Sequence, residues 1–186
     1  MQPDELALQP APRAARAGDW FEAVFRRHYP RLVALVARLT GDRSLAEEIA
    51  ADAFAKLARR SFLLDGDSAM TAWVYRVGMN AGVDALRANS RRKKTEEAAG
   101  LEQLRIGSTE GALDAMLRRE REARVRTILS GMKPRDTQLL LLRSEGLSYR
   151  EIAQTLGLQA NSVGTLLARA EREFERRYRA RFGDAV

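Results

Sequence analysis

LSYREIAQTLGLQANSVGTLL, residues 147–167, has the most informative pattern in the chain. Ser148 and Glu151 have the spacing of a capping box, in which each side chain bonds the other residue's backbone at the start of a helix. Gly157 suits a left-handed turn residue, a conformation that side chains with a Cβ avoid. Apolar residues repeat at helical spacing on both sides of this turn. They are Ile152, Ala153 and Leu156 before it, and Leu158, Val163, Leu166 and Leu167 after it.

This pattern predicts a helix-turn-helix, a motif whose second helix enters the major groove of DNA. An ordinary helical hairpin is the alternative. The first interpretation is favoured because the small, apolar and turn positions all agree. An excess of 32 Lys and Arg over 25 Asp and Glu, a formal net charge of +7, also suits a polyanionic partner. The stretch 87–94, RANSRRKK, holds five of the cations and no anion. Such a run either ends a helix, where cations suit the dipole, or neutralises phosphates, and both roles are compatible.

Several classes of protein are disfavoured by the composition. The chain has no cysteine, which excludes disulfides, a thiol nucleophile and cysteine-based zinc sites. Its single histidine, His28, lies in a helical stripe and is expected to pack rather than to act as a base. Because no metal-ligand pattern or glycine-rich phosphate loop occurs, we expect no enzyme, metal, cofactor or small-molecule substrate. No apolar run approaches the ~18 residues that span a bilayer, and no signal peptide is evident, so we expect a cytoplasmic protein without membrane insertion.

The rest of the chain also has a helical period, which predicts an all-α fold of two small helical domains joined by a flexible linker, with the helix-turn-helix in the second. We expect a disordered tail over 1–19, the first domain over 20–93, the linker over 94–112 and the second domain over 113–182. Helices are expected over 20–40, 44–60 and 70–89. Domains of this size are marginally stable alone, so docking on a larger partner is expected to fix their relative positions.

Three local features refine these expectations. Pro30 removes a backbone donor and predicts a kink or an interruption of the first helix. Ser44 and Glu47 have the spacing of a second capping box. Gly78 and Gly82 are four residues apart, so another helix can approach the third one closely.

Three blocks in order then identify a resemblance. They are LTGDRSLAEEIAADAF (39–54), WVYRVGMNAGVDALRANSRR (73–92) and the segment 147–170. From Trp20 to Tyr178 the chain resembles the extracytoplasmic-function sigma factors of bacteria. The resemblance implies a protein that binds core RNA polymerase, directs it to specific promoters and assists DNA opening, without being an enzyme. The alternatives are a free-standing helix-turn-helix regulator that never engages core polymerase, and an adaptor that binds another protein through helical grooves.

The resemblance implies that the first domain contacts the minus-ten promoter element through its third helix. Asn80, Asp84, Arg87 and Arg91 recur there at three- and four-residue spacing, so they share one face. Asn bonds base edges, and Arg bonds phosphate or guanine. Arg92 and Lys93 extend the predicted DNA-binding face. Trp73 and Tyr75 can offer stacking surfaces for unstacked bases, although a core position is the better interpretation of Trp73.

The second domain is expected to contact the minus-thirty-five element through its recognition helix. The candidate contacts are Gln159, Asn161, Ser162, Thr165 and Arg169; Asn161 or Ser162 can instead cap the helix. Where relatives commonly have V-K-S-R, this chain has VGTL at 163–166. The loss of two cations predicts weaker phosphate anchoring or an unusual promoter sequence.

Core polymerase is expected to bind the acidic residues of the first block, which are Asp42, Glu47, Glu48 and Asp52. Carboxylates on a basic protein complement a basic partner surface such as the polymerase clamp. The family often has Gln and Glu where this chain has Ala51 and Asp52, so one contact of that interface is absent here. Since many relatives are held inactive by an anti-sigma protein, such a factor is a further candidate partner.

Overall fold

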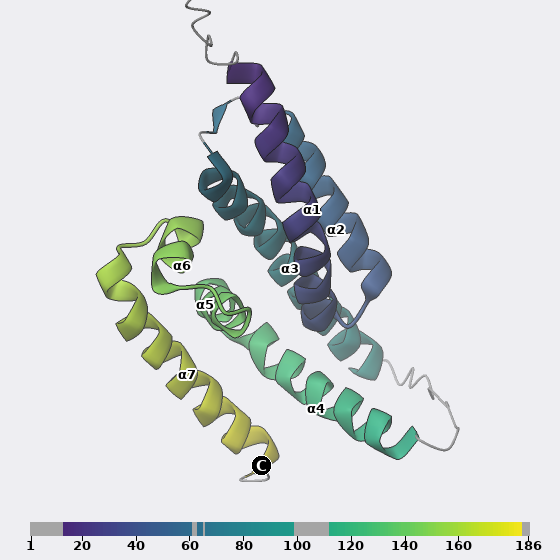
Figure 1. Cartoon of the computed structure of the whole chain (residues 1–186). Coiled ribbons are helices and arrows are strands. Elements are labelled where there is room, and N and C mark those ends of the chain that lie inside the picture. The colour runs from purple at the N-terminus through teal and green to yellow at the C-terminus, as the bar shows by residue number, and fades with distance from the viewer. Residues whose placement is uncertain (1–12, 61–62, 65, 99–111, 184–186) are drawn as a thin grey trace, which may run out of the picture.

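The computed structural model describes residues 13–60, 63–64, 66–98 and 112–183, and its regular structure there is helical (Figure 1). The all-α expectation is confirmed. In these ranges the helices are α1 (Arg13–Thr40), α2 (Arg43–Ala58), α3 (Gly66–Ala98), α4 (Ala112–Gly131), α5 (Pro134–Ser144), α6 (Tyr149–Leu156) and α7 (Ala160–Phe182). Residues 1–12 of the predicted tail and 99–111 of the predicted linker lie outside the described residues.

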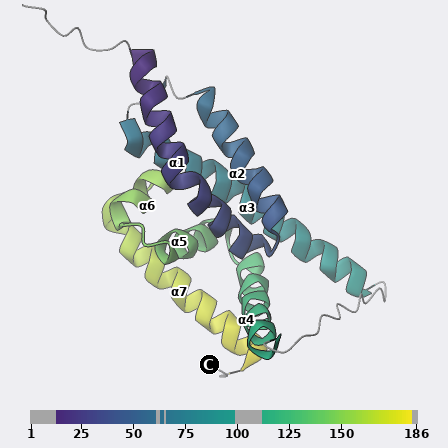
Figure 2. The same cartoon turned by 45° about the vertical axis from the view of Figure 1, so that its right-hand side comes forward.

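Helices α1, α2 and α3 pack on one another as the N-terminal half (Figures 1 and 2). Their apolar stripes supply a core that includes Leu32, Leu35, Phe54 and Met79. Gly78 explains the close approach of α1 to α3, because a Cβ there would lie 2.8 Å from a Leu32 methyl carbon. The prediction drawn from the glycine spacing is therefore confirmed.

Three helix boundaries differ from the expectations. Helix α1 begins at Arg13, inside the predicted tail, and continues without interruption through Pro30 because buried apolar residues on both sides hold it against its neighbours. Helix α2 is capped by Asp42, whose carboxylate accepts from the Leu45 N–H at 3.0 Å, and not by Ser44. Helix α3 continues to Ala98 because its polar end is rich in good helix formers, which need no apolar stripe.

The C-terminal half, α4 to α7, contains the predicted helix-turn-helix. The capping box of Ser148 and Glu151 is present at the start of α6, and Gly157 ends that helix with φ +65° in the left-handed region. Ile152, Val163 and Leu167 are buried between α5, α6 and α7. Pro134 occupies the first turn of α5, where its missing N–H removes no helical hydrogen bond.

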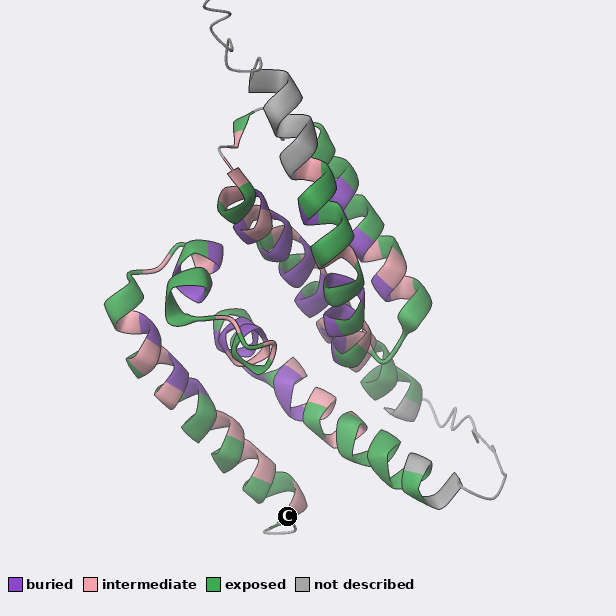
Figure 3. Cartoon of the chain, viewed as in Figure 1, coloured by how far each residue is buried: buried purple, intermediate pink, exposed green. Residues whose placement is uncertain are grey.

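The two halves pack against each other, mainly through α3 on one side and α4, α5 and α6 on the other (Figures 1 and 2). One cluster of buried residues runs through both halves. Figure 3 shows the buried residues on the sides of the helices that face other helices, with the outer sides exposed. A larger partner is therefore not needed to fix the relative positions of the halves in the free chain, contrary to the expectation from their size.

Candidate nucleic-acid interface

The predicted minus-ten face of α3 lies against the C-terminal half. The Asn80 side-chain oxygen accepts a hydrogen bond from the Gln138 amide of α5 at 2.6 Å. Two turns further along α3, the Arg87 guanidinium donates to the Met132 carbonyl at 3.0 Å, just after the end of α4. Asn80 and Arg87 thus lie on a face of α3 that contacts the C-terminal half, and both have partners there.

Most of the predicted residues of α3 are exposed, Asn80 and Arg91 included, whereas Arg87 is half-buried. Asp84, Arg92 and Lys93 are exposed, and the described residues give none of them an ion pair. Arg91 lines a cleft beside α4 and α7. The cation run therefore continues along the surface of α3 from the point where the contact with the C-terminal half ends.

Arg76 is an interface residue that sequence reasoning missed. It lies one helical turn before Asn80, and its guanidinium donates to the Thr155 carbonyl at 2.5 Å and to the Gln154 carbonyl at 2.8 Å. These carbonyls belong to the last turn of α6, where backbone acceptors have no partner within the helix. The four-residue spacing from Asn80 was the available signal, because it extends the same polar face towards the start of α3.

Further polar contacts join the halves around Arg76. Ser68 of α3 donates to the Gln154 side-chain oxygen at 2.8 Å. Arg38 of α1 forms an ion pair with Glu145, which follows α5 and is 15% exposed. The interface thus combines a shared apolar core with hydrogen bonds from α3 residues between Ser68 and Arg87.

Tyr75 is buried where the two halves meet, so in this closed arrangement it is not available to stack on a base. Its hydroxyl lies 3.4 Å from His28 Nδ1, and the two rings meet edge to face. Burial, reinforced by the nearby Arg27, lowers the pKa of His28, and burial raises the pKa of Tyr75. Trp73 packs half-buried against the core, as expected.

The start of α7, the predicted recognition helix, remains open to solvent. Gln159 is the N-cap residue, and Asn161 and Thr165 are exposed. The Ser162 hydroxyl donates back to the Gln159 carbonyl at 2.8 Å, so it binds within its own first turn without capping a backbone N–H. Arg169 is exposed and lies 3.6 Å from the buried Asp136 carboxylate of α5. Contact with the N-terminal half thus leaves this surface accessible.

The four predicted polymerase-binding acids lie along the exposed side of α2 and its cap. Asp42 serves as the cap, Glu47 bonds Arg43 at 2.9 Å, and Asp52 bonds Lys56 at 2.6 Å. Glu48 is exposed and has no ion pair among the described residues. Local partners therefore offset part of the acidic charge on this helix.

Within the described ranges, no group of three or more acidic, histidine or cysteine side chains is placed to hold a metal ion. Among the described helices, none has the length and apolar character to cross a membrane.

Each half of the chain matches a known protein family model. Residues 24–92 match the family model for sigma-70 region 2, and residues 122–174 match that for sigma-70 region 4. The chain is 30% identical over 164 residues to the RNA polymerase sigma-H factor of Pseudomonas aeruginosa, covering 84% of each chain. It is 28% identical over 179 residues to the ECF RNA polymerase sigma-E factor of Escherichia coli K12, covering 90% of this chain and 92% of that protein.

A solved structure has the same fold. CnrH, in complex with the cytosolic domain of CnrY, superposes with a TM-score of 0.61 at 22% identity, covering 91% of this chain and 96% of CnrH. The chain belongs to the sigma-70 family, within its extracytoplasmic-function group. It is an RNA polymerase sigma factor, which binds core polymerase and directs promoter-specific initiation, and it is not an enzyme. This membership favours the sigma-factor interpretation over the free-standing regulator and the adaptor.

Proposed function

We propose that the two halves of this sigma factor contact different promoter elements. Residues 20–93 bind the minus-ten element through Asn80, Arg87 and Arg91 of α3, with Asp84, Arg92 and Lys93 beside them. Residues 113–182 bind the minus-thirty-five element through the start of α7, and the segment 94–112 connects the two. The shared face of the α3 residues and the open start of α7 support this division.

Promoter opening by α3 requires the two halves to separate. The observation that carries this proposal is the 2.6 Å hydrogen bond from the Gln138 amide to the Asn80 side-chain oxygen, because the acceptor that would bond a base edge already has a partner. The hydrogen bond from Arg87 to the Met132 carbonyl has the same consequence for that guanidinium. The recognition helix needs no such release, so in the free chain only the α3 surface has groups, Asn80 and Arg87, that are bonded to the other half.

A pair of variants separates the two roles of Asn80. Asn80→Ala and Gln138→Ala both remove the same hydrogen bond, but only the first removes a group from the promoter-binding face. Reconstituted transcription with core polymerase, and permanganate footprinting of the opened strand, measure their effects. We expect Asn80→Ala to reduce opening more than polymerase binding and Gln138→Ala to leave opening intact or increase it. Equal losses of opening in both variants would refute a direct promoter contact by Asn80.

The contact with core polymerase is proposed to run along α2. Asp42, Glu47, Glu48 and Asp52 supply the carboxylates, and a basic clamp surface complements them. Of these, Glu48 is the most informative position, since the described residues give it no structural hydrogen bond. Because RNA polymerase and chromosomal DNA are cytoplasmic in bacteria, we also propose this location.

An inhibitory protein partner of the anti-sigma type is proposed on a similarity in fold. CnrH was solved with the cytosolic domain of CnrY bound. Co-purification of the tagged chain from its host at native expression level tests this, and recovery with core polymerase alone would contradict it.

A further inference from the structure

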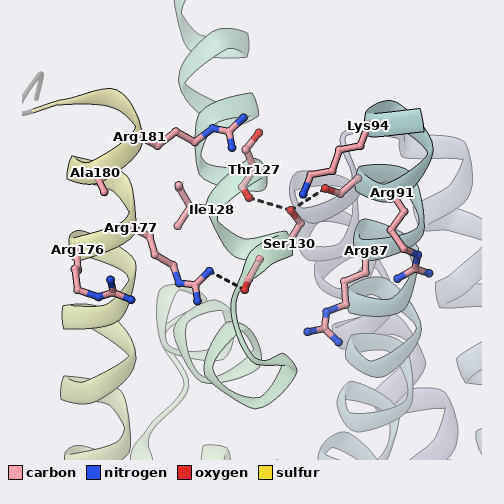
Figure 4. Close-up of a pocket in the computed structure, with 12 residues that line it drawn as sticks. Arg87, Arg91, Lys94, Thr127, Ile128, Ser130, Arg176, Arg177, Ala180 and Arg181 are labelled. Carbon is pink, nitrogen blue, oxygen red and sulfur yellow. Dashed lines mark hydrogen bonds between the residues drawn. The ribbon is translucent and has the colours of Figure 1, made fainter. Parts of the chain in front are cut away.

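A basic cleft lies where the two halves meet, between α3, the end of α4, and α7. Its volume is about 580 Å³, within the range of small-molecule sites. Six cations line it from two sides (Figure 4): Arg87, Arg91 and Lys94 from α3, and Arg176, Arg177 and Arg181 from α7. The end of α4 forms the floor between them, with Thr127 and Ser130. We call this feature the interdomain cleft.

The charge of the interdomain cleft is strongly one-sided. None of its lining residues, all of which the structure describes, is acidic. Glu173 lies nearby and accepts hydrogen bonds from Arg177 at 2.5 Å and from Arg176 at 2.9 Å. These bonds lower the pKa of Glu173, so it stays ionised and offsets one of the six positive charges.

Two of the six cations already have backbone acceptors. Arg87 donates to the Met132 carbonyl and Arg177 to the Gly131 carbonyl at 2.8 Å, so both bind the negative end of the α4 dipole. Lys94, Arg91 and Arg181 have no ion pair among the described residues. In Figure 4 the side chains of Lys94 and Arg181 extend from opposite sides towards α4. Their donors are therefore available to an anion that lies between the halves.

We propose that the interdomain cleft binds a small anion carrying several phosphate groups, and that this anion stabilises the closed arrangement of the two halves. Gathering six like charges opposes closure, and a multivalent anion relieves that repulsion. Phosphate chains accept charge-assisted hydrogen bonds from Arg and Lys on both sides at once. No aromatic ring lines the cleft among the described residues, so nothing there stacks on a base, and the phosphates rather than a nucleoside are recognised.

The consequence is a ligand-controlled block of the minus-ten face. Half of the six cations of the site lie on α3 and half on α7, so an open chain offers no complete site. A ligand that binds only the closed form shifts the equilibrium towards it. The anion binds without being chemically changed. The effect on promoter opening rests on the function proposed above, whereas binding and closure are measured on the chain alone, without polymerase or DNA.

The probe is inorganic tripolyphosphate, with ATP, adenosine, orthophosphate and a short polyglutamate as comparisons. Calorimetry at physiological salt, where non-specific attraction is screened, measures affinity. Closure is followed by energy transfer between dyes on Ala51→Cys of α2 and Glu171→Cys of α7, since the chain has no other cysteine. We expect tripolyphosphate and ATP to bind alike and to raise the energy transfer, and adenosine and orthophosphate to bind far more weakly.

Matched variants locate the site. Lys94→Ala with Arg181→Ala should weaken tripolyphosphate binding about tenfold or more, the loss of at least one charge-assisted hydrogen bond. Arg92→Ala with Arg172→Ala removes the same charge from the same two helices outside the cleft, and should leave binding nearly unchanged. Circular dichroism confirms that both variants fold. Equal weakening in the two pairs, binding without a rise in energy transfer, or tighter binding of polyglutamate would each overturn the proposal.

Discussion

Arg76→Ala is expected to release the C-terminal half from α3. The Arg76 guanidinium donates two hydrogen bonds across the interface, to the Thr155 carbonyl at 2.5 Å and the Gln154 carbonyl at 2.8 Å. Both acceptors are at the C-terminal end of α6, which carries the negative end of the helix dipole. Thr155 is itself buried, so in the variant its carbonyl would lose a partner in a place where water has little access.

The size of the effect follows from these contacts. Hydrogen bonds to a charged group contribute about 1.5–3 kcal/mol each when shielded. Arg76 is exposed, so solvent screening reduces the figure to about 1 kcal/mol for each bond. Loss of both therefore destabilises the closed arrangement by about 2 kcal/mol, which shifts the ratio of closed to open chains about thirtyfold.

The assay measures opening directly and then its consequence. Energy transfer between dyes on α2 and α7 reports the separation, and titration with core polymerase reports apparent affinity. If only the open chain binds polymerase fully, apparent affinity rises with the open fraction. Glu145→Gln weakens the Arg38 ion pair from the other half of the chain and should act in the same direction. Unchanged energy transfer and unchanged polymerase affinity in both variants would refute this reasoning.

Three further predictions concern single elements. Ser148→Ala removes the hydroxyl half of the capping box and should cost about 1 kcal/mol in urea unfolding. Hydrogen bonds from the Ser148 hydroxyl and then its N–H lower the pKa of Glu151, so this stabilisation is present above the ordinary glutamate pKa and is lost as pH falls through the lower folded value. The variant keeps the N–H, so it should lose the larger part of that pH dependence and not all of it. Gly78→Val forces carbon atoms against α1 and should cost about 1–3 kcal/mol, measured by thermal unfolding. Glu48→Lys should weaken core polymerase binding in a pull-down, by opposing a basic partner surface.

Each of these has a control in the same chain. Gly164→Ala places its Cβ at an ordinary 3.4 Å from Tyr149 and should stabilise α7 by up to about 1 kcal/mol, so destabilisation by both glycine variants would contradict the argument from space. Glu171→Lys makes the same charge change as Glu48→Lys, but on α7. Equal loss of polymerase binding would mean that net charge, and not the position of Glu48, is responsible. A Ser148→Ala chain that keeps the full acid sensitivity would exclude the capping box as its source.

The helix-turn-helix was predictable because its signals are local. Ser148 and Glu151 are three residues apart, and the left-handed φ of Gly157 needs only the residue itself. The close approach of α1 at Gly78 was predictable for a similar reason, since two small residues on one helical turn mark a thin face. The end of α3 at Ala98 could not be predicted. A solvent-exposed helix end needs no apolar stripe, and its polar sequence resembles that of a linker.

The contact between the halves could not be predicted from the sequence. Asn80 and Gln138 are 58 positions apart, and Arg76 binds backbone carbonyls, which carry no sequence signature. A polar helix face that binds DNA and one that binds another helix also contain the same residue types. The DNA-binding role of this α3 face therefore stays a prediction, and its contact with the other half of the free chain was not foreseen.

Asn80 and Arg87 bond the other half in the closed chain and are proposed to bond the promoter in the open one. This double role limits how strongly closure can oppose promoter binding. Each polar contact between the halves contributes about 0.5–1.5 kcal/mol net, since water replaces it on opening. When α3 binds promoter DNA, base edges and phosphates replace those partners instead, so opening exchanges one set of hydrogen bonds for another. The apparent affinity for polymerase falls only by the fraction of chains that are open, about a hundredfold if 1% are. A binding partner that prefers the open chain by more than this factor shifts most chains to the open form. An anion in the interdomain cleft raises the ratio of closed to open chains, so the partner then needs a larger preference.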